Sequence, residues 1–410
     1  MSDGTNYDET IILIIIQIQN IMKRALLVAT VLLLSGNFCF AQITVGNDSL
    51  FSKQEPLFEK LGVFKAWETT KGNPEILIGC IDNGFDFYHP YLHNQLITGY
   101  YADGVYHPMT FTTIAHGTLV SSLMVANPKN ENGMHGLAPE CKVLTASIGS
   151  IEHLFRQRQE IMKDNPNMSM MEVMKELNKD TVAVQRFANR WNTYAGEAIA
   201  KSILYLVQNN VKVINISAEI VAVYPEPTQQ KIDEAFDYAR KHDVLMVIAA
   251  GNSNKEIPNT LKHRDNIIIV GASSKNDTRW TMMTGGITQG SNWGELLDVC
   301  APTEDLVVCQ PSDDRFYKTD DGPMGTENVP HKGGICDVMP FGATSSAAPI
   351  VTSLAALVYS VEPNITANEV KKVIIAGCDD IGEVGYDIHT GHGRINFAQT
   401  VALIKNRKTE

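Results

Sequence analysis

The sequence EILIGCID occupies residues 75–82, an apolar run that is almost uninterrupted and ends in a carboxylate. Comparable apolar runs recur along the chain, at residues 143–148, 211–216, 244–250 and 267–270. Their apolar residues are consecutive rather than alternating, which is typical of strands buried on both faces, as in a parallel sheet.

Amphipathic helical patterns lie between these runs. Apolar residues share one helical face in residues 199–207 and again in residues 232–239. Near the C-terminus, Thr366 and Glu369 have the spacing of a capping box, and Gly377 is placed to end that helix. The alternation of strand and helix predicts an α/β fold of three layers, with a mostly parallel central sheet covered by helices on both faces.

The chain has 410 residues, of which 44% are hydrophobic and 20% charged, as expected of a globular protein. Its formal net charge of −12 argues against a nucleic-acid-binding protein. Nothing in the sequence requires an oligomer, and we expect a monomer.

Residues 1–41 differ in character from the rest. Lys23 and Arg24 precede an apolar run at residues 25–34, and Cys39 and Ala41 offer small side chains at the two positions that a signal peptidase reads. This order of features predicts a secretory signal and export of the protein. The apolar run is short for a bilayer span, and it would be removed with the signal, so we expect no membrane span in the mature chain.

Residues 1–21 precede this signal. Translation that starts at Met22 is the simplest explanation of them. The alternative is an uncleaved anchor that also uses the apolar residues 11–16, which would place two basic residues inside the span.

The rest of the chain divides into a short N-terminal segment, residues 42–60, and one domain, residues 61–404. The short segment leaves no room for an inhibitory prodomain. Residues 151–192 are rich in charged residues and methionine and predict a helical insertion, whereas residues 311–332 predict a long polar loop.

The cysteines give only weak evidence for disulfides or a metal site. Export makes disulfides feasible, and Cys309 and Cys336, which flank the polar loop, are the pair to test first. Cys80 and Cys141 lie in apolar runs and are better explained as buried thiols. No cysteine or histidine cluster has zinc-ligand spacing, and we assign no metal ligands.

Asp82 and His116 occupy positions where an acid–base pair can be built. Asp82 closes a predicted strand, at the carboxyl end where α/β proteins place their sites. His116 is followed by Gly117 and Thr118 before a helical stretch, and the glycine permits a close approach to the imidazole. Taken separately, a turn aspartate and an incidental histidine explain these residues at least as well.

Ser345 lies in the small-residue stretch GATSSAAP, residues 342–349, with Pro349 expected in the first turn of the following helix. A serine at a helix N-terminus feels the positive end of the helix dipole. Asn252 ends another apolar strand, where its amide could donate to an oxyanion, although a turn asparagine is the plainer interpretation. The length of the small-residue stretch favours a functional serine over simple packing.

The order Asp, His, Ser along the chain is one of the orders known for catalytic triads. The blocks IDNG (81–84), HGT (116–118), AGN (250–252) and ATSSAAP (343–349) resemble motifs of the subtilisin-like serine proteases, the subtilase family or peptidase family S8. Flanking blocks agree, and the resemblance extends over nearly all of the mature chain.

This resemblance implies a secreted serine endopeptidase with a subtilisin-like fold. Ser345 would attack the scissile carbonyl, His116 would accept its proton, and Asp82 would orient the imidazole. Asn252, with a backbone amide near Ser345, would bind the oxyanion.

The resemblance also implies contacts with a polypeptide substrate in extended conformation. Two stretches would pair with it and wall its specificity pocket: Ser217, Ala218, Glu219 and Ala249, Ala250, Gly251. The chain departs from the family pattern at Glu219 and Ala343, where glycine is usual, and at Asn83, where serine or threonine is usual.

Two other functions stay open at this point. A catalytically silent peptide-binding protein is kept open by Glu219 and Ala343, although the complete triad argues against it. A peptide ligase or cyclase would differ only in water exclusion from the acyl-enzyme, which sequence does not decide. No cofactor is required for catalysis; structural calcium is an option, and the acidic residues 313–321 lack a calcium-loop spacing.

Overall fold

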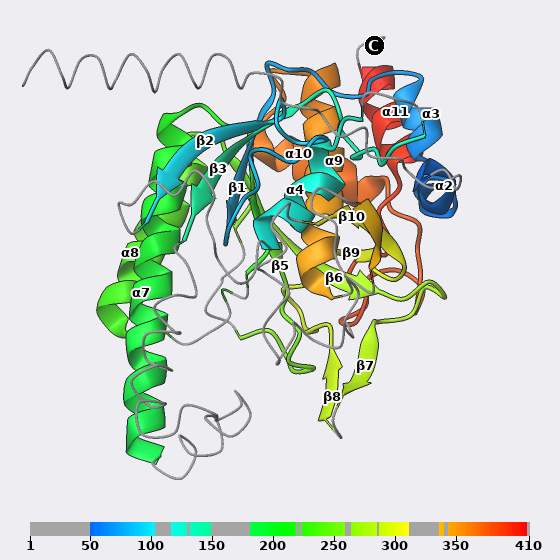
Figure 1. The fold of residues 1–410 in the computed structure, drawn as a ribbon. Helices are drawn as coiled ribbons and strands as arrows, with labels where there is room; N and C mark the ends of the chain where they lie inside the picture. Colours follow the sequence, from blue (N-terminus) through cyan, green and yellow to red (C-terminus); the bar gives the residue numbers. More distant parts are fainter. Residues whose placement is uncertain are drawn as a thin grey trace, which may run out of the picture. The chain divides into compact units, whose positions relative to one another are not determined.

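Seven parallel strands form the central sheet, in the order β2-β3-β1-β4-β5-β6-β9 (Figure 1). The strands are β1 (Leu77–Asp82), β2 (Leu96–Tyr101), β3 (Lys142–Ser147), β4 (Val213–Ile216), β5 (Leu245–Ala249), β6 (Ile267–Ser273) and β9 (Val299–Pro302). All five apolar runs form strands of this sheet, so the predicted parallel sheet is confirmed.

This computed structural model describes residues 50–102, 116–128, 132–148, 181–218, 220, 224–258, 264–284, 287–310, 336–339 and 343–407. Several predicted features lie outside the described residues: the signal at 1–41, residues 151–180 of the insertion, Glu219, and the polar loop 311–332.

Each face of the sheet has its own core, because alternate residues of a strand point to opposite faces. In β5, Leu245, Val247 and Ala249 face one core, whereas Met246 and Ile248 face the other. The first core, here called the α9 core, is covered by α4 (His116–Val125), α9 (Thr344–Val361), α10 (Ala367–Ala376) and α11 (Phe397–Arg407). The second, the α7 core, is covered by α7 (Thr181–Gln208) and α8 (Glu226–Lys241) (Figure 1). The predicted three-layer architecture is therefore confirmed.

Helix α9 is the central helix of the α9 core. It is the one helix of the described residues long and apolar enough to cross a membrane, and 83% of it is buried inside the protein. It begins at Thr344, so Pro349 is its sixth residue and does not lie in the first turn, as the sequence had suggested. The first turn holds Ser345 instead.

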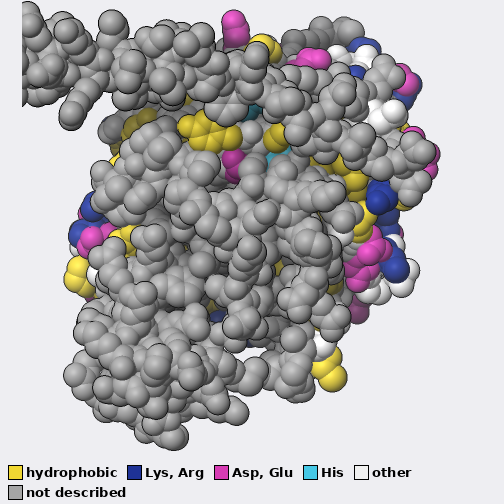
Figure 2. All heavy atoms as spheres, in the orientation of Figure 1, with side chains coloured by type: hydrophobic (Ala, Val, Ile, Leu, Met, Phe, Trp, Pro, Cys, Tyr) yellow, Lys and Arg dark blue, Asp and Glu magenta, His cyan; other side chains and the backbone are white. Residues whose placement is uncertain are grey.

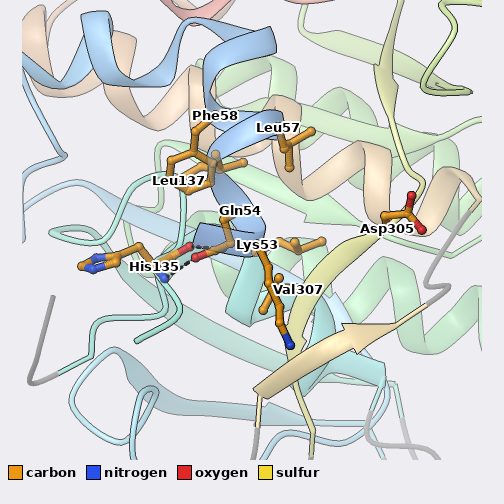
Figure 3. A pocket seen from close by; sticks show the side chains of 9 residues that line it. Lys53, Gln54, Leu57, Phe58, His135, Leu137, Asp305 and Val307 are labelled. Atoms are coloured by element: carbon orange, nitrogen blue, oxygen red, sulfur yellow. Dashed lines mark hydrogen bonds between the residues drawn. The ribbon is translucent and has the colours of Figure 1, made fainter. Parts of the chain in front are cut away.

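Helix α2 (Leu50–Leu61) lies in the stretch taken from sequence as a short N-terminal segment, and it packs into the α9 core through Phe58 and Leu61. Gln54 exchanges two hydrogen bonds with the backbone of His135, each 2.8 Å long, which anchor the helix. Figure 3 shows a small pocket under α2, lined by Lys53, Gln54, Leu57, Phe58, Leu123, His135, Leu137, Asp305 and Val307. None of these residues is a predicted site residue. The short helix α3 (Val63–Trp67) follows α2.

Two small antiparallel sheets were not predicted. Strands β7 (Thr281–Thr284) and β8 (Ile287–Gly290) form a hairpin, and β10 (Leu306–Cys309) pairs with β11 (Cys336–Met339). Strand β10 packs against α4, and β11 precedes α9 in the chain.

The end of the predicted insertion is continuous with a core helix. Helix α7 begins at Thr181, inside the stretch 151–192, and continues through the amphipathic residues 199–207. With 28 residues it is about 42 Å long, and its C-terminal part packs on the sheet.

The capping box of α10 is confirmed. Thr366 Oγ1 accepts a hydrogen bond from the backbone of Glu369, whose carboxylate accepts one from Thr366 N. Gly377 ends the helix, and the reason for glycine is space: a Cβ there would lie 2.3 Å from Thr400 Oγ1 on α11.

The described surface carries charges of both signs. Figure 2 shows basic and acidic side chains interspersed along the margins of this view. Ion pairs join some charged side chains of the described residues, as in Lys231–Glu197 and Arg240–Asp265, both 2.7 Å. No basic face of the kind that binds nucleic acid is seen among the described residues in this view.

Candidate active site

A carboxylate–imidazole pair lies at the carboxyl end of β1. Asp82, the last residue of β1, is buried, and its two carboxylate oxygens lie 2.8 and 2.9 Å from His116 Nδ1. A carboxylate only accepts hydrogen bonds, so the proton of a neutral imidazole is held on Nδ1. Nε2 then carries the lone pair that a general base requires.

Gly117 allows helix α4 to start against the loop that follows β1. Its N–H donates to Asn83 O at 2.9 Å, and a Cβ on it would lie only 2.8 Å from Gly84 O. The absence of a side chain at this position therefore permits the close approach that brings His116, the first residue of α4, to Asp82.

The pKa of His116 is set by opposing influences. Burial, the largest of them, lowers the pKa, but the charge of Asp82 and its hydrogen bond together raise it above the ordinary value of 6.5. The imidazole is still 24% exposed, so it is reachable from solvent. A raised pKa makes His116 a stronger base, and it also means that the ring is protonated over a wider acidic range.

Ser345 is the second residue of α9, so its backbone N–H has no carbonyl partner within the helix. Its carbonyl lacks the usual partner too, because Pro349, four residues on, has no N–H. Ser217 Oγ supplies the missing donor and bonds Ser345 O at 2.9 Å. The Ser345 hydroxyl in turn donates to Ser217 O at 3.1 Å. These two bonds hold the serine against the segment that follows β4.

Ser217 is itself fixed by a buried network. Asn215 Nδ2, on β4, donates to Ser217 Oγ at 2.9 Å. Asn215 Oδ1 accepts from Thr352 Oγ1, on α9, at 3.0 Å. Both groups of the Asn215 amide are thus hydrogen-bonded, and the network links β4 to α9 at Ser345 and again at Thr352.

Asn252 follows β5 and is oriented by the start of α9. Its Oδ1 accepts hydrogen bonds from the backbone N–H and the hydroxyl of Thr344, both at 2.9 Å. A backbone N–H can only donate, so the amide oxygen must face Thr344 and the NH2 group must face away from it. Asn252 therefore has a donor group held in a fixed direction, next to the residue that precedes Ser345.

Ala343, immediately before α9, has φ 83° and ψ 172°. This region of backbone conformation is essentially reserved for glycine, and a residue with a Cβ is strained there by about 1–3 kcal/mol. The glycine that is usual at this position in the resembling family has a physical reason, and this chain carries the strain beside Ser345.

The stretch Ala249, Ala250 and Gly251 is buried, with its N–H groups already engaged. Ala250 N donates to Val270 O at 2.9 Å, and Gly251 N donates to Thr344 Oγ1 at 3.1 Å. This stretch can wall a pocket, but its internal bonds leave no N–H of Ala250 or Gly251 to pair with a peptide.

The predicted residues gather at one edge of the sheet. Asp82 closes β1, Ser217 and Ala218 follow β4, and Asn252 follows β5; these three strands are neighbours, and their parallel carboxyl ends meet. Helix α4, which begins with His116, packs against α9. The Ser345 hydroxyl donates to Ser217 O, so proton transfer to His116 would require this hydroxyl to rotate.

Sequence reasoning missed the supporting residues. Thr344 orients Asn252, Asn215 holds Ser217, and buried Asn292 donates to Ala250 O at 3.0 Å. Asn215 and Asn292 lie in blocks that resemble the family, VINIS at 213–217 and SNWG at 291–294, which was the available signal.

Among the described residues, one group of three histidine, cysteine or acidic side chains lies close enough together to share a metal ion: His89, Cys309 and Cys336, all buried. Calcium takes oxygen ligands, so this nitrogen and sulfur set does not fit it.

Residues 73–393 match the sequence profile of the subtilase family, which is more than half of the chain. The thermophilic serine proteinase of Bacillus sp. strain AK1 is 25% identical over 366 residues, which cover 89% of this chain and 71% of that protein. A calcium-dependent protease of Nostoc sp. strain PCC 7120 is 28% identical over 194 residues, or 44% of this chain and 28% of the relative. Two other curated relatives are covered over 42% of their own length.

Solved structures share the fold. The crystal structure of MycP1 from Mycobacterium smegmatis superposes with a TM-score of 0.58 at 19% identity, covering 84% of this chain and 83% of that chain. At this identity the likeness concerns the fold.

Proposed function

The chain belongs to the subtilase family of serine-type peptidases, and we propose that it is an exported endopeptidase with Asp82, His116 and Ser345 as its catalytic triad. The observation that carries this proposal is the buried Asp82–His116 pair at the edge of the sheet where the segments after β4 and β5 hold Ser345 and its neighbour Thr344.

The proposed reaction begins with Ser345. Its hydroxyl leaves Ser217 O and donates to His116 Nε2, which removes the proton as the oxygen attacks the scissile carbonyl. Asp82 keeps the proton on Nδ1 and stabilises the imidazolium that forms. His116 then protonates the leaving amine, and water hydrolyses the acyl-enzyme by the reverse sequence.

We assign the oxyanion to two donors, the Asn252 side-chain NH2 and the Ser345 backbone N–H. The first is directed by its bonds to Thr344, and the second lies in the first turn of α9, where the helix dipole also favours negative charge. Donors that are fixed before the reaction avoid reorganisation in the transition state.

The substrate in this proposal is a polypeptide in extended conformation. Ala249, Ala250 and Gly251 serve as a wall of its pocket, consistent with their engaged N–H groups. Pairing with the substrate backbone is left to Ser217, Ala218 and Glu219, the last of which lies outside the described residues.

Export and calcium binding are the less supported parts. Export rests on the signal pattern at residues 22–41, and a structural calcium ion rests on the named calcium dependence of a relative. No step of the proposed reaction involves that ion.

A fluorophosphonate probe tests the proposal, because it forms a covalent adduct only with an activated serine. We expect labelling of the purified chain and none of Ser345→Ala. Ser353→Ala is the matched control: it removes a hydroxyl from the same helix, one that bonds Pro349 O within that helix. Labelling of Ser345→Ala would contradict the proposal, because the activated serine would then lie elsewhere. No labelling of the folded parent would also contradict it and would support a silent peptide-binding protein.

Product mass separates hydrolysis from the ligase or cyclase alternative. Hydrolysis adds one water to the sum of the products, whereas transfer to an amine does not. No observation on the described residues favours the alternative.

A further inference from the structure

Cys309 and Cys336 face each other at one end of the β10–β11 ladder. They are direct partners in the antiparallel register, and both are almost fully buried. Their sulfur atoms lie 2.7 Å apart. That separation is well inside the contact distance of two non-bonded sulfur atoms, so two thiols cannot rest there unchanged.

A metal ion between these sulfurs would need a different geometry. Two thiolates on one tetrahedral zinc ion, with bonds of about 2.3 Å, lie about 3.8 Å apart. His89, the third member of the cluster, is also unsuited: Tyr91 N donates to its Nδ1 at 3.2 Å. The proton of the neutral ring is then on Nε2, so neither nitrogen offers a lone pair to a metal.

We propose that Cys309 and Cys336 form a disulfide bond in the exported protein. Two thiols and one small-molecule disulfide give the protein disulfide and two small-molecule thiols; the two S–H protons pass to the released thiols, and an S–S bond forms as another breaks. This inference goes beyond the proposed protease activity and does not depend on it.

The bond would join the two segments that lead to the proposed catalytic residues. Strand β11 ends at Met339, a few residues before Ala343 and the start of α9. Strand β10 is tied to α4, the helix that begins with His116, because Cys309 N donates to Ser122 Oγ at 3.0 Å. A covalent link between β10 and β11 therefore fixes the chain that enters α9 relative to α4.

The surroundings favour a stable bond rather than a readily exchanging one. Burial, above all, raises the pKa of the Cys309 thiol well above its ordinary value, and the neighbouring Cys336 raises it further, although His89 acts in the opposite direction. Thiolate is the species that attacks disulfides, so a buried, protonated thiol exchanges slowly.

Peptide mapping tests the bond on the full chain carrying Ser345→Ala, which prevents self-digestion. The protein is unfolded and refolded in a buffer of reduced and oxidised glutathione, so that both thiols are accessible while the bond can form, and is then denatured, alkylated and digested with trypsin. Arg315, Lys318 and Lys332 separate the two cysteines, which fall in the peptides 280–315 and 333–371. We expect these two peptides to be linked by a disulfide, and to separate when the protein is reduced first.

Cys300 shares the first peptide with Cys309, which supplies a matched control. Cys300→Ser should keep the linked pair and Cys309→Ser should lose it. The oxidised protein should also unfold about 5 °C above the reduced one, a difference that Cys309→Ser abolishes. Alkylation of both cysteines as free thiols after oxidation, or one zinc ion retained per chain, would overturn the proposal.

Discussion

The two faces of the central sheet are covered by helices of different kinds. Helix α9 is buried along nearly its whole length, whereas α8 buries one stripe and exposes the rest to solvent. The proposed catalytic residues belong to the first kind: Ser345 lies in the first turn of α9, and His116 begins α4, which packs on it. A helix buried on all sides has its N-terminus fixed by the core. A nucleophile in the first turn of such a helix is therefore held in a fixed position. The α7 core, by contrast, contributes stability.

The largest effect expected on the α9 face is that of Asp82→Asn. An amide at this position can donate as well as accept, so the imidazole loses its fixed tautomer, and kcat should fall about 10⁴-fold. Because the charge that raises the pKa of His116 is removed while burial remains, the acidic limb of the kcat/KM profile, which reports the free enzyme, should also move to lower pH.

The direction of the pH dependence follows from the protonation state of His116, the proposed base. In the parent, activity should fall as the pH drops through a pKa above 6.5, where His116 becomes protonated. Kinetics with a chromogenic peptide from pH 5 to 9 provide the profile. Asp86→Asn, on the same loop, is the control and should leave the limb in place; an unchanged limb in Asp82→Asn would contradict the assignment.

The complementary change on the α7 face is Phe236→Ala. Phe236 is 1% exposed and packs against the Arg264 guanidinium, 5.2 Å from the ring centre. Its truncation should lower the free energy of unfolding by about 3–5 kcal/mol. Below the unfolding transition kcat should be nearly unchanged, as denaturant melts and kinetics on the same sample will measure. A large loss of kcat in the folded variant would contradict the view that the α7 face contributes stability rather than catalysis.

Asn252→Asp sharpens the comparison within the α9 face. The carboxylate keeps an oxygen for the Thr344 donors but replaces the NH2 group assigned to the oxyanion. We expect kcat to fall about 10²–10³-fold, close to the loss known for one oxyanion donor, in a protein that melts like the parent. A loss of stability without a loss of kcat would make Asn252 structural.

The smallest expected effect is that of Ala343→Gly. The substitution relieves the strain of a positive φ but increases the freedom of the unfolded chain, so a net gain of about 1 kcal/mol in unfolding free energy is expected. Thermal unfolding measures the change. Ala347→Gly, at the fourth residue of the buried helix, is the control and is expected to destabilise. A destabilised Ala343→Gly variant would show that the backbone there is not strained.

The layers and the central strands could be predicted from the sequence, because runs of apolar residues indicate burial directly. It did not predict β2, whose segment LITGYY holds Gly99 and has only Leu96 fully buried, so no apolar run marks it. The bounds of α9 were also missed: Pro349 was expected near its start, yet the helix begins five residues earlier.

The candidate site was predictable to the extent that its residues lie in motifs. Asp82, His116, Ser345 and Asn252 were found from their blocks, whereas the roles of Asn215 and Thr344 depend on which side chains meet across the sheet. Such contacts between distant segments leave no periodic signal in the chain.

The separations along the chain at this site have a kinetic consequence. Asp82 and His116 are 34 residues apart, Asn252 and Thr344 are 92 apart, and Ser217 and Ser345 are 128 apart. Parallel pairing of distant strands is a slow event in folding, because loop closure must precede the contacts that reward it. A chain still being made, or crossing a membrane unfolded, therefore lacks the assembled site. The large sequence separation between the site residues therefore delays the proposed activity until the last helices have packed onto the sheet.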